Sequence, residues 1–429
     1  MDLLNLKPNI FNLIENAFKE ELPSITFNIQ ILNLFNHVNF LKNGPICYLK
    51  LKNSGKEFLA HGAFEIFETL PQTKNLNDDQ FIFGAEEFPS AKGTNKKLES
   101  FFFRPIIVYQ KLDNINTEVK IYLDYNKIKN KNELTKFILH VFDLLDFERK
   151  KELPKNSISE IIEVPEIDSW KTYIDKITKS IDKSQKVVLS RKKIISFKHP
   201  IALDEITNHL SETDQDNQYI FLLKKSANSC FISVSPEKLF SSYNQNIYVD
   251  CIAGTRARGT SKHEDQILEK QLIDSEKERN EHLFVANFIQ EKLVNLCKDV
   301  TMTKAFDILK LKKVQHLHSE FKGTIRDEAS SIDFLNLLHP TPAVAGTPTQ
   351  NALQTIYQLE KSNRGLYAGA CGIASKNFTE FLVGIRSIAI EGNTVNIYGG
   401  AGIVNQSDYL QEWNETENKM QNFSFLWSK

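Results

Sequence analysis

Two acidic pairs with the same spacing stand far apart in the sequence, Glu278 with Glu281 and Glu412 with Glu415. Each pair lies in a stretch with helix-like periodicity, and side chains three residues apart share one face of a helix. Two such helices brought together would offer four carboxylates, an all-oxygen site of the kind that Mg²⁺ prefers. Most pairs of this spacing are solvated helix faces, so a metal site needs support from other residues.

Four further residues could supply acid, base or anion-binding groups. Lys186 opens the strand-like segment KVVLS; it is either solvated or a desolvated general base. Glu237 follows an apolar strand, where it either caps the next turn or acts as a general acid. Arg386 is predicted in mid-strand among apolar neighbours, where a guanidinium needs an anionic partner such as a carboxylate. Lys419, four residues after Glu415, either pairs with it or binds a second anion.

Glycine clusters are the remaining candidates for contact with a ligand. They occur at Ala253-Gly254-Thr255, around Gly365, Gly369 and Gly372, and at 399–402, and they are either tight turns or places of close backbone approach. None has the spacing of a dinucleotide or phosphate loop, so a nucleotide-binding function is unsupported. His316 is interpreted as a core-edge histidine or a site residue. Together, a metal cage, two cations and an acid–base pair suit a small dianionic substrate.

The overall composition is that of a soluble globular protein. The 429 residues are 41% hydrophobic and 25% charged, with a formal net charge of -1, which gives no bias toward nucleic acid or a membrane. Five scattered cysteines without a C-x-x-C argue against a disulfide framework and zinc, and for a reducing compartment. Because neither a signal peptide nor an apolar stretch of membrane-spanning length is present, we expect a cytoplasmic protein.

The elements that must position these residues mix strands and helices without a regular βα repeat, which predicts an α+β fold built on antiparallel sheets. Short strands and loops are expected up to about residue 150, and a connection from Phe147 to about Trp170. The later elements are predicted as a helix over 170–181, one long helix over 264–297 with Phe284 among its apolar positions, a helix from Thr347-Pro348 to about Ser362, a hairpin over 381–403 turning at Glu391-Gly392-Asn393, and a last helix from Ser407-Asp408.

Nine segments in the second part of the chain resemble the chorismate-utilising enzymes, and among them the isochorismate synthases. They are KVVLSR (186–191), FISVSPEKLF (231–240), CIAGTRARG (251–259), SEKERNEH (275–282), LLHPTPAVAGTPTQ (337–350), RGLYAGACG (364–372), FLVGIRSIAI (381–390), YGGAGIV (398–404) and EWNETENKM (412–420), in the order of the family. The resemblance divides the chain into a catalytic region, 161–429, and a variable N-terminal half, 1–160, which is expected to complete the same fold.

The resemblance implies one large α+β domain in which two antiparallel sheets, flanked by helices, enclose the active site. It also implies Mg²⁺-dependent conversion of chorismate to isochorismate, by addition of water at C2 and loss of the C4 hydroxyl. By motif, Lys186 would be the base and Glu237 the acid. The remaining implied roles are metal binding by Glu281 and Glu415 directly and by Glu278 and Glu412 through water, carboxylate binding by Arg386, Lys419 and the backbone around Gly254, Thr255, Gly400 and Gly402, and contact with the ring by His316, Ala343 and Val344.

The choice within the family depends on two positions. Ammonia-using members usually lack a lysine at the position of Lys186, so water is the expected nucleophile. Salicylate synthases, which go on to eliminate pyruvate, and ammonia-using members typically have S-G-x-P-K where this chain has Ala345-Gly346-Thr347-Pro348-Thr349. Isochorismate synthase is therefore expected, with salicylate synthase as the alternative. No glutamine amidotransferase partner is expected, the chain is expected to be a monomer or loose homodimer, and its pathway, menaquinone or siderophore biosynthesis, stays open.

Overall fold

The computed structural model describes residues 6–41, 43–52, 54–90, 100–146, 156–182, 185–213, 218–310 and 314–427, without the side chains of Lys277 and Glu281. The described strands are β1 (Ser24–Gln30), β2 (Ile46–Lys50), β3 (Glu57–Phe67), β4 (Phe81–Glu86), β5 (Phe101–Lys111), β6 (Asn116–Tyr122), β7 (Ile158–Val164), β8 (Lys186–Phe197), β9 (Tyr219–Ser226), β10 (Ser229–Ser235), β11 (Lys238–Tyr243), β12 (Asn246–Ala257), β13 (Cys297–Lys310), β14 (Val314–Ile325), β15 (Gly346–Thr347), β16 (Ala370–Ser375), β17 (Phe378–Val383), β18 (Ser387–Glu391) and β19 (Thr394–Ile403).

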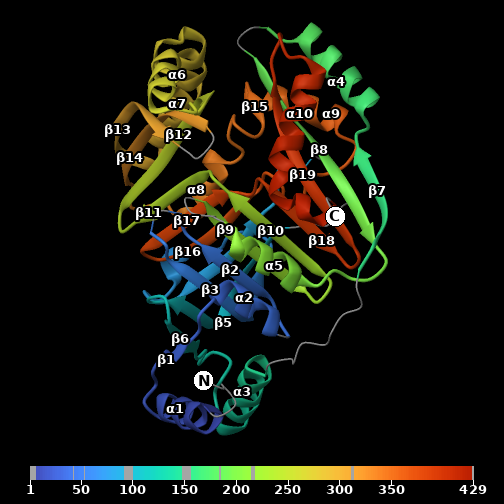
Figure 1. Cartoon of the computed structure of the whole chain (residues 1–429). Helices are drawn as coiled ribbons and strands as arrows, with labels where there is room; N and C mark the ends of the chain where they lie inside the picture. Colours follow the sequence, from blue (N-terminus) through green and yellow to red (C-terminus); the bar gives the residue numbers. More distant parts are fainter. Residues whose placement is uncertain are drawn as a thin grey trace.

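The described α-helices lie between and around these strands (Figure 1). They are α1 (Lys7–Lys19), α2 (Leu34–His37), α3 (Lys131–Leu144), α4 (Ile167–Ser180), α5 (Leu203–Glu212), α6 (Lys262–Asp274), α7 (Glu276–Leu296), α8 (Ser331–Leu338), α9 (Thr349–Leu359) and α10 (Tyr409–Met420). Among them, none is both long enough and apolar enough to cross a membrane.

Every strand pairing described is antiparallel, and the pairings define two sheets that meet at β5. The first sheet has the order β7-β8-β19-β18-β10-β9-β2-β3-β5-β6-β1, with β15 beside the start of β8. The second has the order β13-β14-β12-β11-β17-β16-β4, and β4 shares one edge of β5 with β6. The α+β class with antiparallel sheets is therefore confirmed.

Strands from the first 160 residues belong to both sheets. β2 pairs with β9 and β7 with β8 in the first sheet, whereas β4 pairs with β16 in the second. Of the connection expected from Phe147 to about Trp170, residues 147–155 lie outside the described ranges, and most of the described part forms β7 and the start of α4. The N-terminal strands thus supply the pairing of β4 with β5 that connects the two sheets.

Two of the places where the chain passes between the sheets are important for the site: it crosses from the first sheet to the second between β10 and β11, and from the second to the first between β17 and β18. Glu237 lies on the first crossing and Arg386 on the second. Two backbone hydrogen bonds of 3.1 Å tie the crossings to the strands beside them, from Val383 N–H to the Glu237 carbonyl and from Val234 N–H to the Arg386 carbonyl. The prediction of Arg386 in mid-strand is wrong: β17 ends before it, and its φ of +48° is left-handed.

The helices that carry the acidic pairs begin at side-chain caps. The single helix expected over 264–297 is two helices, because the chain breaks at Ser275, whose hydroxyl accepts the Glu278 N–H at 3.4 Å. The expected last helix is confirmed, since Asp408 caps α10 by accepting the N–H groups of Leu410 and Gln411 at 3.0 Å. Each pair therefore lies in the first two turns of its helix. The turn at Glu391–Asn393 is also confirmed, although its first strand starts at Ser387.

Candidate active site

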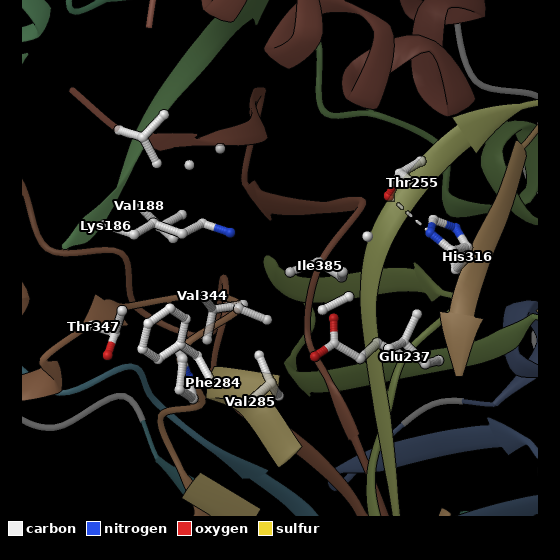
Figure 2. Close-up of a pocket in the computed structure, with 18 of the residues that line it drawn as sticks. Lys186, Val188, Glu237, Thr255, Phe284, Val285, His316, Val344, Thr347 and Ile385 are labelled. Atoms are coloured by element: carbon white, nitrogen blue, oxygen red, sulfur yellow. Dashed lines mark hydrogen bonds between the residues drawn. The ribbon is translucent and has the colours of Figure 1, made fainter. Parts of the chain in front are cut away.

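A cavity of about 980 Å³ lies between the two sheets (Figure 2). Its lining comes from β8 and β19 of the first sheet, β12 and β14 of the second, both crossings, α7 and α10. The structure brings the following predicted residues together in this lining: Lys186, Glu237, Gly254, Thr255, His316, Ala343, Val344, Arg386, Gly400, Gly402, Glu415 and Lys419. Residues more than 230 positions apart in the sequence, such as Lys186 and Lys419, thus meet because the two sheets fold onto one another.

The glycines of β19 leave the room that Lys186 occupies. Along this strand alternate residues face the same side, so Gly400 and Gly402 share a face. A Cβ atom at Gly402 would lie 2.3 Å from Cε and 3.1 Å from Nζ of Lys186, and one at Gly400 would lie 2.5 Å from the Tyr367 hydroxyl oxygen. The lysine side chain therefore extends into the cavity across the backbone of Gly402, which has no side chain to block it.

Glu237 faces Lys186 across the cavity in Figure 2, where the amine and the carboxylate point inward from opposite sides. Burial raises the pKa of Glu237 to about 7, although the positive charges of Lys419, Lys186 and Arg386 oppose that rise. A substantial fraction of this carboxyl is therefore protonated near neutral pH. It can donate a proton there, which an ordinary surface glutamate cannot do.

The wall formed by β12 and β14 carries a neutral polar pair beside a β-bulge. The register shifts between Ala253 and Thr255, and Gly254 takes up the extra residue with a φ of +79°. Thr255 stands opposite His316, and its hydroxyl lies 2.9 Å from Nδ1 of that imidazole. Burial lowers the pKa of His316 to about 4, so the ring is uncharged at neutral pH. The bulge aims both side chains into the cavity.

Arg386 and Lys419 are the cations that the sequence analysis assigns to anion binding. Burial lowers the pKa of Arg386, against the favourable charge of Glu237, and its guanidinium donates a 3.5 Å hydrogen bond to Gln218 Oε1. Lys419 donates to Glu415 Oε1 at 2.7 Å and to the Gly400 carbonyl at 2.9 Å. The sequence left an ion pair with Glu415 and binding of a second anion as alternatives for Lys419; the structure shows the ion pair, at the rim of the cavity.

The acidic pairs are split between the two walls. On α7, Glu278 accepts the Thr255 N–H at 3.1 Å, and the side chain of Glu281 lies outside what the structure describes. On α10, Glu412 accepts the Ser407 hydroxyl at 2.7 Å. Burial raises the pKa of Glu412, and the nearby charge of Glu415 raises it further. Two carboxylates on α10 are therefore close enough to repel, which a bound cation would relieve.

The chemistry of these groups fits a hard divalent cation. All are carboxylates, and α7 and α10 border the same cavity from opposite walls. Among the described side chains, which exclude that of Glu281, no three His, Cys, Asp or Glu groups form a ready metal cluster. Glu278 and Glu412 also lie outside the cavity lining, behind the bulge and beside Ser407 respectively. Direct ligation by Glu281 and Glu415 with water-mediated contacts to the other two remains a prediction.

Several lining residues were not predicted from the sequence. The rings of Tyr367 and Tyr398 stack at 4.9 Å with an angle of 7° between them, and both border the cavity. Phe284 was expected among the apolar core positions of its helix, yet it is 49% exposed and lines the cavity with Leu283. Phe284 follows Glu281 by three residues on a helix, so its shared face with the acidic pair was the available signal.

The sequence profile of the chorismate binding enzyme family matches residues 27–425. The match covers most of the chain, including the strands of both sheets and every residue placed in the cavity above. The chain therefore belongs to the chorismate binding enzyme family.

Individual relatives agree with this assignment. The chain is 34% identical over 256 residues to isochorismate synthase MenF of Bacillus subtilis (strain 168), which covers 59% of this chain and only about half, 54%, of that protein. It is 27% identical over 379 residues to isochorismate synthase MenF of Haemophilus influenzae, covering 87% of this chain and 84% of the relative. The solved structure of MenF, the menaquinone-specific isochorismate synthase from Escherichia coli, shares the fold, with a TM-score of 0.79, 24% identity and coverage of 96% and 98%.

Proposed function

We propose that the chain is an isochorismate synthase, which converts chorismate to isochorismate with Mg²⁺ as cofactor. The observation that supports it most directly is the placement of the Lys186 amine and the Glu237 carboxyl on opposite sides of one cavity, with the pKa of Glu237 near 7. Exchange of one hydroxyl for another at two ring carbons needs a base for the incoming water and an acid for the leaving hydroxyl. These two residues can fill those roles from opposite faces of a ring between them.

In the proposed reaction Lys186 removes a proton from water as the water oxygen bonds to C2 of chorismate. The ring double bonds shift, the bond from C4 to its hydroxyl oxygen breaks, and Glu237 donates the proton that makes this oxygen a leaving water. One water is added and one is released, so the product is an isomer of the substrate. Lys186 finishes protonated and Glu237 ionised, and proton exchange with solvent restores both.

The remaining cavity residues are assigned to substrate binding. Arg386 and the backbone N–H groups around Gly254 and Gly402 would bind carboxylates, because bidentate guanidinium and peptide donors suit them. Lys419 would contribute once its bond to Glu415 is exchanged for one to the substrate. Neutral His316 would face the ring near the reacting hydroxyls. Ala343 and Val344 would pack against the ring plane, and Tyr367 lines the same space.

Mg²⁺ would be held directly by Glu281 and Glu415, with Glu278 and Glu412 binding its waters. When bound, the ion supplies positive charge that neutralises and orients the ring carboxylate of chorismate. The repulsion between Glu412 and Glu415 supports a cation site on α10. Glu415→Gln should therefore weaken Mg²⁺ binding, and titration calorimetry without substrate measures it; an unchanged affinity would remove this helix from the metal site.

The test of the proposed activity is chromatography of the products from chorismate and Mg²⁺, with a pyruvate assay on the same sample. We expect reversible formation of isochorismate without pyruvate. Stoichiometric pyruvate would instead assign salicylate synthase, and an aminated product formed only with ammonium would assign an ammonia-using member of the family. No turnover with either nucleophile would contradict the proposal.

A further inference from the structure

Arg191 is a fully enclosed guanidinium on the side of β8 that faces α10. It is 1% exposed and stands opposite Gly399 in the ladder between β8 and β19. A Cβ atom at Gly399 would lie 2.7 Å from the Thr416 carbonyl oxygen of α10, so the glycine allows the helix to approach the sheet closely. Arg191 and Lys193, which is 6% exposed and donates to Glu417 Oε1 at 2.6 Å, are the charged groups buried at this contact, and the cavity chemistry described above uses neither.

Nearly every contact of the Arg191 guanidinium is made with α10. Nε donates to Thr416 Oγ1 at 2.6 Å, Nη2 donates to Glu417 Oε2 at 2.5 Å, and Nη2 also lies 3.5 Å from the Trp413 carbonyl oxygen. The guanidinium stacks 3.6 Å from the centre of the Trp413 ring. The contact outside the helix is an ion pair of 3.4 Å between Nη1 and Glu163 of β7. One side chain thus engages three positions spread over more than a turn of α10.

These contacts fix both the rotation of α10 about its axis and its position along that axis. Successive residues of an α-helix turn by about 100° and rise by about 1.5 Å. Glu415 and Lys419, which line the cavity, are the immediate sequence neighbours of Thr416 and Met420 on the sheet-facing side. A slip of α10 by one residue against Arg191 would turn both side chains away from the cavity. Figure 1 shows α10 lying along β19, the arrangement that such a slip would disturb.

We propose that Arg191 is a positioning residue, which locks α10 in the one register that presents Glu415 and Lys419 to the cavity. What those two residues bind there rests on the proposed function; the locking itself does not. Arginine suits this task because its planar donors reach a hydroxyl and a carboxylate in fixed directions while its face stacks on an indole. Lysine offers a single ammonium and cannot make all of these contacts.

The first test measures the helix itself by hydrogen exchange of the full-length chain. In Arg191→Met the amides of α10 should exchange at least about tenfold faster than in the wild type, while those of β12 and β14 keep their rates. Glu163→Gln is the matched control, because it removes the ion pairs of Arg191 and Lys193 to β7 and leaves the direct contacts of both side chains to α10. It should leave α10 exchange unchanged. Equal acceleration throughout the chain, or none in α10, would overturn the proposal.

The second test measures Mg²⁺ binding by titration calorimetry without substrate. Groups hydrogen-bonded directly to metal ligands typically change metal affinity by roughly 10- to 100-fold, and because Arg191 acts on Glu415 through the helix we expect Arg191→Met to weaken binding by about tenfold. Arg191→Lys should restore little of it, and Glu163→Gln should bind as the wild type does. Wild-type affinity in Arg191→Met would overturn the proposal.

The two tests separate this proposal from the proposed function. If the wild-type chain binds no Mg²⁺, the metal assignment fails, and the exchange of α10 still decides the role of Arg191. Should Arg191→Met not fold, Thr416→Val removes the acceptor of Nε while keeping the side-chain volume. It should speed exchange in α10 in the same direction by a smaller factor, and unchanged exchange in this variant would count against the lock.

Discussion

The two walls of the cavity differ in the charge of the side chains they present and in the kind of contact that holds their helices. The first-sheet wall, β8 with β19 and α10, presents the amines of Lys186 and Lys419 over a strip of glycines, and Arg191 holds its helix. The second-sheet wall, β12 with β14 and α7, presents neutral His316 and Thr255 beside a β-bulge. Its helix α7 leaves Phe284 half exposed toward the cavity.

This difference sets the protonation of Glu237, the acid of the proposed reaction. Glu237 lies on the crossing between the walls, where burial favours its protonated form and the cations of the first wall favour its ionised form. The two influences leave its pKa at about 7. The uncharged imidazole of His316 on the second wall is part of the balance, because a protonated ring there would add another positive charge that stabilises the carboxylate.

Removing the base from the first wall should have the largest effect. Lys186→Met keeps most of the aliphatic stem but removes the amine, and loss of a general base typically lowers turnover by roughly 10²- to 10⁴-fold. Chorismate consumption followed by product chromatography measures it, with Lys179→Met on the exposed side of α4 as the control. If Lys186→Met turns over within a few-fold of the wild type, the base lies elsewhere.

A methyl group added at Gly402 on the same wall should have the next largest effect. Gly402→Ala places a methyl group in the space of the Lys186 stem, and displacement of a catalytic group by about 1 Å can cost roughly 10²-fold in rate. In the Lys186→Met background the same substitution should add little, because the displaced amine is already gone. Kinetics of both single variants and the double variant give the comparison. Fully additive losses would mean that Gly402 acts independently of Lys186.

The pH dependence tests the charge balance on the crossing. Because Glu237 must be protonated to act as an acid and its pKa is about 7, the fraction of this carboxyl able to donate a proton should fall as pH rises through 7, approaching tenfold per unit above it, whereas loss of a proton from the base favours turnover in the same direction. Raising the pKa above its ordinary value of 4.5 also means that this group contributes stability below pH 4.5 that is lost as pH rises through 7. Glu237→Gln should therefore gain stability relative to the wild type between pH 5 and pH 8, which denaturant unfolding at both values measures. A constant difference would place the pKa of Glu237 outside this window.

A change in the Thr255–His316 pair of the second wall should have the smallest effect. Thr255→Val removes the 2.9 Å bond to His316 while keeping the shape of the side chain, and one hydrogen bond of this kind is worth about 1 kcal/mol. We expect a change of a few-fold in kcat/KM with an unchanged fold, measured by initial rates and by thermal unfolding. A loss as large as that of Lys186→Met would mean that the second wall takes part in proton transfer.

Local patterns in the sequence were sufficient for several features of the site. The spacing of Glu412 and Glu415, together with the cap at Asp408, predicted their helix because capping and periodicity act within a few residues. The glycines of β19 were interpreted as either tight turns or places of close backbone approach, and the structure shows the second. What approaches them, the stem of Lys186 and the hydroxyl of Tyr367, could not be inferred, since pairing of β8 with β19 brings Lys186 alongside and tertiary packing brings Tyr367 from a distant turn.

The sequence by itself determined the antiparallel α+β class, the two acidic helices and, through its motifs, the membership of the chorismate binding enzyme family. Tertiary structure alone decided which groups act together. It placed Arg386 in a left-handed turn on a crossing instead of in a strand, exposed Phe284 to the cavity, and set Arg191 behind α10. The pKa of Glu237 belongs to the same class of property, because burial and charge depend on neighbours contributed by both sheets and both crossings.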